Sequence, residues 1–100
     1  MITKSYFEKL EKQYGTLTFG DLLKAWREGE DMTQTAFAKK VGLSVQNLND
    51  LEKSRRIPTP TRAARLAKKL GLPEMGVIEL AIRDSLIKEG FKYEVKLKSA

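Results

Sequence analysis

The chain has 100 residues, 41% of them hydrophobic, and 19 lysines and arginines against 13 acidic residues give it a formal charge of +6. This length suits one compact domain, and the positive charge favours a polyanionic partner, because bound cations release counterions condensed on phosphates. The sequence has no cysteine and no histidine, which excludes disulfides, thiol nucleophiles, zinc-finger sites and imidazole acid–base chemistry. We therefore expect no enzyme, no catalytic residue, no metal and no cofactor.

A membrane or export signal is not apparent in the sequence. No apolar run approaches the roughly 18 residues that span a bilayer. The N-terminal segment, residues 1–4, lacks the apolar centre of a signal peptide. A cytoplasmic protein without a membrane partner is the expectation.

Two helices are expected in the first third of the chain. Residues 5–14 carry apolar side chains at helical spacing, so a short N-terminal helix is expected there. A second helix is expected from Phe19 to about Gly29, because Thr18 is a suitable N-cap and Asp21 suits the positive end of the helix dipole. Residues 1–18 are thus assigned to an N-terminal helix and linker.

Two short helices follow in quick succession. Thr33 opens the first, which Gly42 ends, and Ser44 almost at once caps the second, which runs to Lys53. Glycine suits the abrupt turn at position 42, because a positive φ costs a residue with a Cβ about 1 kcal/mol. The side chains expected to close the core under this pair are Phe37, Val41, Leu43, Leu48 and Leu51.

The C-terminal half begins with a proline-rich loop. Thr61 is expected to cap a helix from Arg62 to Leu70 that Gly71 closes, and Pro73 precedes a further helix over residues 74–89. Residues 91–98 alternate apolar and charged side chains, which predicts a short strand.

Polar side chains face outward on the helix that Ser44 caps. Glutamine and asparagine are poor choices for helix stability there, because they compete for backbone hydrogen bonds, but they can pair with adenine, and a valine can meet a thymine methyl group. Asp50 has three interpretations: it accepts from cytosine, deters wrong sequences or bonds a neighbouring side chain. The residues expected to contact bases are Val45, Gln46, Asn47, Asn49 and Asp50. The alternative is an exposed helix face without a partner.

From about Leu23 to Leu72, the chain resembles the phage-repressor and Cro type of helix-turn-helix protein, the Xre-like regulators. The positions that carry the resemblance are Arg27, Met32, Thr33, Gln34, Phe37, Ala38, Val41, Gly42, Ser44, Leu48, Leu51, Glu52, Pro58, Leu66, Ala67, Leu70 and Gly71. It implies an all-α, five-helix repressor-like domain, here with an extra N-terminal helix and a C-terminal β-strand, divided into residues 1–18, 19–72 and 73–100.

The same resemblance assigns roles to individual residues. It implies an ion pair between Arg27 and Glu52, and a phosphate contact from Gln34 at a helix N-terminus. The chain departs from the family at Ser54, where glycine usually ends the helix. Ser54 must therefore adopt a positive φ at a cost, or the helix ends differently.

A basic stretch follows the helix expected to contact bases, and no acid interrupts it before Glu74. Phosphate contacts from such a stretch would set register and supply affinity, and base contacts would discriminate sequences. The expected phosphate-binding residues are Thr33, Gln34, Ser44, Lys53, Arg55, Arg56 and Arg62. Taken alone, the stretch favours a solvated surface, and only its position next to the two-helix pattern favours phosphate binding.

The C-terminal segment has more apolar surface than one core requires. A lone strand leaves its backbone groups unsatisfied and invites a partner, so a homodimer is favoured over a frayed tail or a strand packed on the chain's own helices. The residues expected at the interface are Ile78, Ile82, Leu86, Phe91, Tyr93, Val95 and Leu97.

These patterns predict a transcriptional regulator, by analogy with the family a repressor, that binds double-stranded DNA. A homodimer would place the helix from Ser44 to Lys53 of each copy in the major groove of a pseudo-palindromic operator. One alternative is an antitoxin that autoregulates its operon and neutralises a toxin protein through a terminal segment. Another is an adaptor that makes only protein contacts.

Overall fold

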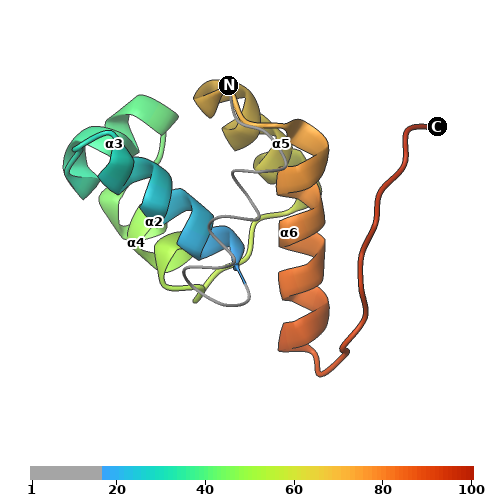
Figure 1. The fold of residues 1–100 in the computed structure, drawn as a ribbon. Helices are drawn as coiled ribbons and strands as arrows, with labels where there is room; N and C mark the ends of the chain where they lie inside the picture. Colours follow the sequence, from blue (N-terminus) through green and yellow to red (C-terminus); the bar gives the residue numbers. More distant parts are fainter. Residues whose placement is uncertain (1–16) are drawn as a thin grey trace.

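The computed structural model describes residues 17–100, and the described chain is all-helical, without a strand (Figure 1). The all-α prediction is therefore confirmed for this part of the chain. The predicted N-terminal helix at residues 5–14 lies outside the described residues. The helices are α2 (Phe19–Gly29), α3 (Gln34–Val41), α4 (Val45–Glu52), α5 (Pro60–Leu70) and α6 (Glu74–Lys88).

Hydroxyl side chains begin the first three of these helices, as predicted. The Thr18 hydroxyl accepts the Asp21 N–H at 3.0 Å, and the Asp21 carboxylate accepts the Thr18 N–H at 3.2 Å, which completes a capping box. Thr33 caps α3 and Ser44 caps α4 by accepting the N–H three residues later. Each cap satisfies an amide without an intrahelical partner and fixes where the helix starts.

The start of α5 differs from the prediction. Thr59 caps this helix by accepting the Arg62 N–H at 3.2 Å, and Pro60 is its first residue. Proline suits that position because its missing N–H would have no partner there and its φ is already helical. The prediction of Thr61 as the cap was wrong because it assigned both prolines to a loop.

Each described helix is followed by a residue with positive φ: Asp31, Gly42, Ser54, Gly71 and Gly90. After each one, the next amide returns to a carbonyl five residues earlier, as from Leu43 to Ala38 at 2.8 Å. This is the Schellman arrangement, which satisfies carbonyls at the helix end. The helices therefore end abruptly, and the chain turns back to pack them around one core.

That core draws on every described helix. Phe37 of α3, Leu48 of α4 and Ala67 of α5 have no exposed surface, and Leu22 of α2 and Val77 of α6 are 1% exposed. Leu43 is half-buried and packs against the same cluster. In Figure 1, α2, α3 and α4 form one group and α5 and α6 cover its other side.

A buried carboxylate joins α6 to the start of α2. The Phe19 N–H, one of the first amides of α2, donates to the Asp84 carboxylate at 2.7 Å. Burial raises the pKa of Asp84 above its ordinary value, although the hydrogen bond from Phe19 and the charge of Arg83 act in the opposite direction.

The free energy of unfolding of the Asp84→Asn variant is expected to depend less on pH than that of the wild type. Between the unfolded and the folded pKa of Asp84, the folded protein keeps a proton that the unfolded protein has lost. The stabilising contribution of this group is therefore fully present below the unfolded pKa, and it is lost as the pH rises through the folded pKa. Asparagine keeps the acceptor oxygen for Phe19 and does not titrate. Urea unfolding from pH 4 to 7 should show the wild type losing stability relative to the variant, whereas a constant difference would contradict this role.

The predicted C-terminal strand is wrong, since residues 91–100 have no regular secondary structure. A strand needs a neighbour to accept its backbone N–H groups, and residues 17–100 supply none. The tail instead turns at Gly90 and runs back beside α6 (Figure 1), where the Leu97 N–H donates to the Glu79 carboxylate at 2.7 Å. Phe91 and Tyr93 remain exposed and stack with ring centroids 6.0 Å apart.

Candidate nucleic-acid interface

The turn between α3 and α4 leaves one side of α4 exposed to solvent. Gly42 has φ 75°, and only three residues separate the end of α3 from the start of α4. The inward face of α4 carries Leu48 and Leu51, which are buried. The opposite face opens to solvent at the first turn, where Val45, Gln46 and Asn47 are exposed, whereas Asn49 and Asp50 are half-buried. The five residues predicted to contact bases thus divide into an exposed group and a partly covered group.

Gly20 sets how closely α2 approaches α4, and sequence reasoning missed it. A Cβ at this position would lie 2.5 Å from the Leu51 carbonyl oxygen and 2.6 Å from that of Glu52. Both atoms belong to the backbone at the end of α4, so they cannot move aside as a flexible side chain would. The absent side chain therefore fixes the position of α4. The available sequence signal was a glycine in the first turn of a helix, where no positive φ requires one.

A polar network holds α4 from behind. Arg27 of α2 donates from Nε to Glu52 Oε2 at 2.7 Å and from Nη2 to Oε1 at 3.0 Å. The Glu52 side chain is only 3% exposed, and its hydrogen bond raises the pKa of Arg27 above the ordinary value. This is the ion pair that the family resemblance implied. It ties the C-terminal end of α4 to α2 through two parallel charge-assisted hydrogen bonds, a geometry specific to arginine.

Gln34 extends this network to the outward face. Its Nε2 donates to Glu52 Oε1 at 3.0 Å and to Asn49 Oδ1 at 3.2 Å. Both amide hydrogens of Gln34 are therefore occupied, which leaves its backbone N–H at the start of α3 for the predicted phosphate contact. The Asn49 side chain is fixed because its Oδ1 accepts the hydrogen bond from Gln34, which leaves mainly its Nδ2 group available to a base.

A second network runs along the exposed side of α4. Gln46 Nε2 donates to Asp50 Oδ1 at 3.0 Å, and the same carboxylate oxygen lies 3.6 Å from Nη1 of Arg55. Among the interpretations of Asp50, a bond to neighbouring side chains is the one seen here. Gln46 retains its carbonyl oxygen and one amide hydrogen, the acceptor and donor that the major-groove edge of adenine requires.

A helix-turn-helix family model matches residues 23–75, more than half of the chain. This chain belongs to the helix-turn-helix family. Neither a curated protein nor a solved structure matches it. The matched span contains α3, the turn at Gly42 and α4, the elements whose geometry is described above. The helix-turn-helix protein is therefore a DNA-binding transcriptional regulator.

Exposed cations follow α4 in this helix-turn-helix protein. Lys53, Arg55, Arg56 and Arg62 are all exposed. Among residues 17–100, no carboxylate pairs with Lys53, Arg56 or Arg62, whereas Arg55 lies near Asp50. The Thr33 and Ser44 hydroxyls, also predicted phosphate ligands, accept backbone amides at two helix N-termini, where the dipole favours an anion. The structure thus places cations at the end of α4 and two helix N-termini at the starts of α3 and α4.

Ser54 ends α4 with the positive φ that the family's glycine would adopt. Its φ is 58°, and it allows the Arg55 and Arg56 amides to return to the Asp50 carbonyl at 2.9 and 3.2 Å. The sequence left open whether Ser54 adopts a positive φ at a cost or the helix ends differently. The first of these occurs, so the chain enters the basic loop with the backbone conformation that glycine would adopt.

The Ser54→Gly variant is expected to be more stable by about 1 kcal/mol, because glycine adopts positive φ without a Cβ clash. The shift in urea midpoint measures this gain. Asp31→Gly, at a φ of 54°, is the matched comparison and should gain less, since aspartate tolerates the left-handed region better than serine. An unchanged or lowered midpoint for Ser54→Gly would contradict strain at this position.

The part of the chain that the structure describes holds no group of three or more metal-ligating side chains. No helix between residues 17 and 100 is long and apolar enough to cross a bilayer.

Proposed function

We propose that this regulator is a repressor that inserts α4 into the major groove of a pseudo-palindromic operator. The observation that carries the proposal is the exposed first turn of α4, where Val45, Gln46 and Asn47 project while Glu52 and Leu51 hold the same helix from behind. A side chain that must find a base edge gains specificity when its helix is fixed before binding. Base contacts come from this turn, with Asn49 and Asp50 orienting their neighbours.

Phosphate contacts flank this helix on both sides. The N-termini of α3 and α4 contact phosphates of one DNA strand, through Thr33, Gln34 and Ser44. The cations after α4 contact phosphates of the other strand, and they are Lys53, Arg55, Arg56 and Arg62. Such contacts supply register and a salt-dependent share of the affinity but carry no sequence information directly.

A homodimer would present two α4 helices to one face of the duplex. The support is apolar surface at the C-terminal side of the molecule: Phe91 is 48% exposed, Tyr93 66% and Ile87 47%. A two-fold axis near α6 and the tail would bring this surface together with the half-buried residues Ile78, Ile82, Leu86, Val95 and Leu97. Half-sites would then lie about 34 Å apart, one turn of B-DNA. Occupancy of a promoter by this dimer would exclude RNA polymerase.

The stacked, exposed pair Phe91 and Tyr93 favours a second candidate, an antitoxin of the phage-repressor type. In that case the tail binds a toxin protein and the helical core regulates the shared operon. The purified chain alone would then be monomeric, and it would co-purify with the product of a neighbouring reading frame. Sedimentation of the purified chain separates the two candidates.

Selection of bound sequences from a random duplex pool tests the proposal as a whole. A repressor dimer predicts enrichment of two inverted half-sites separated by one helical turn. Enrichment of a single half-site would contradict the dimer but retain α4 as the base-contacting element. A pool that remains random, with binding insensitive to salt, would instead favour the adaptor that makes only protein contacts.

A further inference from the structure

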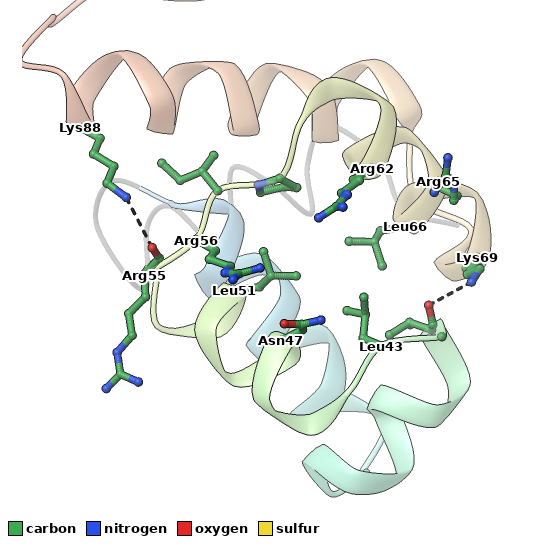
Figure 2. Close-up of a pocket in the computed structure, with 14 residues that line it drawn as sticks. Leu43, Asn47, Leu51, Arg55, Arg56, Arg62, Arg65, Leu66, Lys69 and Lys88 are labelled. Atoms are coloured by element: carbon green, nitrogen blue, oxygen red, sulfur yellow. Dashed lines mark hydrogen bonds between the residues drawn. The ribbon is translucent and has the colours of Figure 1, made fainter.

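A cleft of about 570 Å³ lies between α5 and α6 on one side and α3 and α4, the helix-turn-helix pair, on the other (Figure 2). This volume lies within the roughly 300–1,000 Å³ of small-molecule sites. Two lysines span the two ends of the cleft. Lys69 of α5 donates to the Val41 carbonyl at 3.0 Å, and Lys88 of α6 donates to the Arg55 carbonyl at 3.4 Å. The cleft therefore lies between two parts of the fold that these two lysine side chains join.

The lining of the cleft combines apolar side chains with positive charge. Leu43, Leu51, Ile57 and Leu66 contribute apolar surface, and Asn47 is its one uncharged polar side chain. The cations that line it are Arg55, Arg56, Arg62, Arg65, Lys69 and Lys88, and no acidic residue is among the lining residues. In Figure 2, Arg56 and Arg62 extend into the cleft from opposite sides, whereas the Arg55 side chain points away. Neither Arg56 nor Arg62 pairs with a carboxylate in the described chain.

A DNA backbone accounts for only part of this arrangement. Phosphate oxygens need cations and amides at a surface, and they gain nothing from an apolar floor or from a deep volume behind it. Two guanidinium groups without a carboxylate partner, in a cleft that leucines also line, are instead complementary to a compact anion attached to an apolar body. Arginine also suits this task because it binds carboxylates and phosphates through two parallel hydrogen bonds.

We propose that this cleft binds a small amphipathic anion, a phosphate or carboxylate group on an apolar body, and that the bound anion displaces DNA. Arg56 and Arg62 hold the charged group, and Leu43, Leu51 and Leu66 cover the apolar body. The displacement rests on the proposed function, in which Asn47, Arg56 and Arg62 face DNA. One guanidinium group cannot bind the ligand and a backbone phosphate in the same way at once, so the two partners compete.

Phenyl phosphate tests the site without DNA. Titrated into the ¹⁵N-labelled full chain, it should shift the amides around Leu43 and Arg56 saturably and bind at least tenfold more tightly than inorganic phosphate. Phenol alone should not saturate the site. Arg62→Gln should weaken phenyl phosphate about tenfold, because half of the anion clamp is lost. Lys68→Gln, which removes the same charge from an exposed position of α5 outside the cleft, should weaken it less than twofold.

Inorganic phosphate binding as tightly as phenyl phosphate would overturn the site, since it would show a phosphate track without an apolar subsite. Equal losses in the two variants would overturn it as well, because they would indicate diffuse attraction. A short duplex added to the complex should then release the probe. A duplex that binds while phenyl phosphate stays bound would refute the competition. If phenyl phosphate saturates the cleft and no duplex binds at all, the cleft site stands and the proposed DNA function fails.

Discussion

Replacing Arg27 by methionine is expected to destabilise the protein by about 3–5 kcal/mol, the cost of leaving a buried charge without its partner. The Glu52 carboxylate is 3% exposed and accepts two hydrogen bonds from Arg27, at 2.7 and 3.0 Å. Methionine keeps much of the side-chain volume, so the loss reports the charge and not a cavity. Because small domains are stable by only about 5–15 kcal/mol, this single change is expected to remove a large share of the free energy of unfolding.

Two variants separate this effect from a general loss of charge. The double variant Arg27→Met with Glu52→Met removes both charges and should regain most of the stability, since apolar pairs often replace buried ion pairs without cost. Lys40→Met breaks an exposed pair with Glu30 and should cost less than about 1 kcal/mol. Urea unfolding monitored by circular dichroism gives all three values. A loss for Arg27→Met no larger than that for Lys40→Met would show that the buried pair does not hold α4.

Replacing Gly20 by alanine is the second large effect, an expected destabilisation of about 1–3 kcal/mol. The added methyl group would lie within 2.6 Å of two backbone carbonyl oxygens of α4, a separation that real atoms do not adopt. Relief requires α2 and α4 to move apart, which also displaces the exposed turn at Gln46. We therefore expect weaker DNA binding in addition to the lower unfolding midpoint.

The Gly29→Ala variant is the matched control, because it lies on the same helix and its added Cβ meets nothing within 4 Å. It should be neutral or slightly stabilising, as alanine favours helix over glycine. The comparison uses urea midpoints and binding to one duplex. Equal stability of the two variants would mean that α2 and α4 separate without cost, contrary to the close approach at Gly20.

Local interactions made much of the fold predictable from sequence. Thr18, Thr33 and Ser44 start helices through a hydrogen bond to an amide three residues away, so the relevant chemistry lies within one turn. The start of α5 was misplaced because both prolines were assigned to a loop, although the preference of proline for the first helical position favours Thr59 over Thr61 as the cap. The tail strand failed for a different reason, since strand formation depends on a partner that the sequence pattern cannot supply.

The candidate site was only partly predictable because its details depend on contacts between distant residues. The outward polar face of α4 followed from helical periodicity. By contrast, the hydrogen bonds from Gln34 to Asn49 and Glu52 join separate helices, and their geometry depends on how α3 and α4 cross. The close approach at Gly20 has the same origin. Both features came from packing, which single-residue preferences do not contain.

The affinity of the Gln46→Ala variant for the selected operator and for a scrambled duplex tests most directly whether α4 contacts bases. Gln46 is exposed and makes no core contact, so the variant should fold normally. We expect about 1–3 kcal/mol weaker binding to the operator and unchanged binding to the scrambled duplex, measured by fluorescence anisotropy at one salt concentration. Equal losses on the two duplexes, or no loss on the operator, would contradict a base contact from α4.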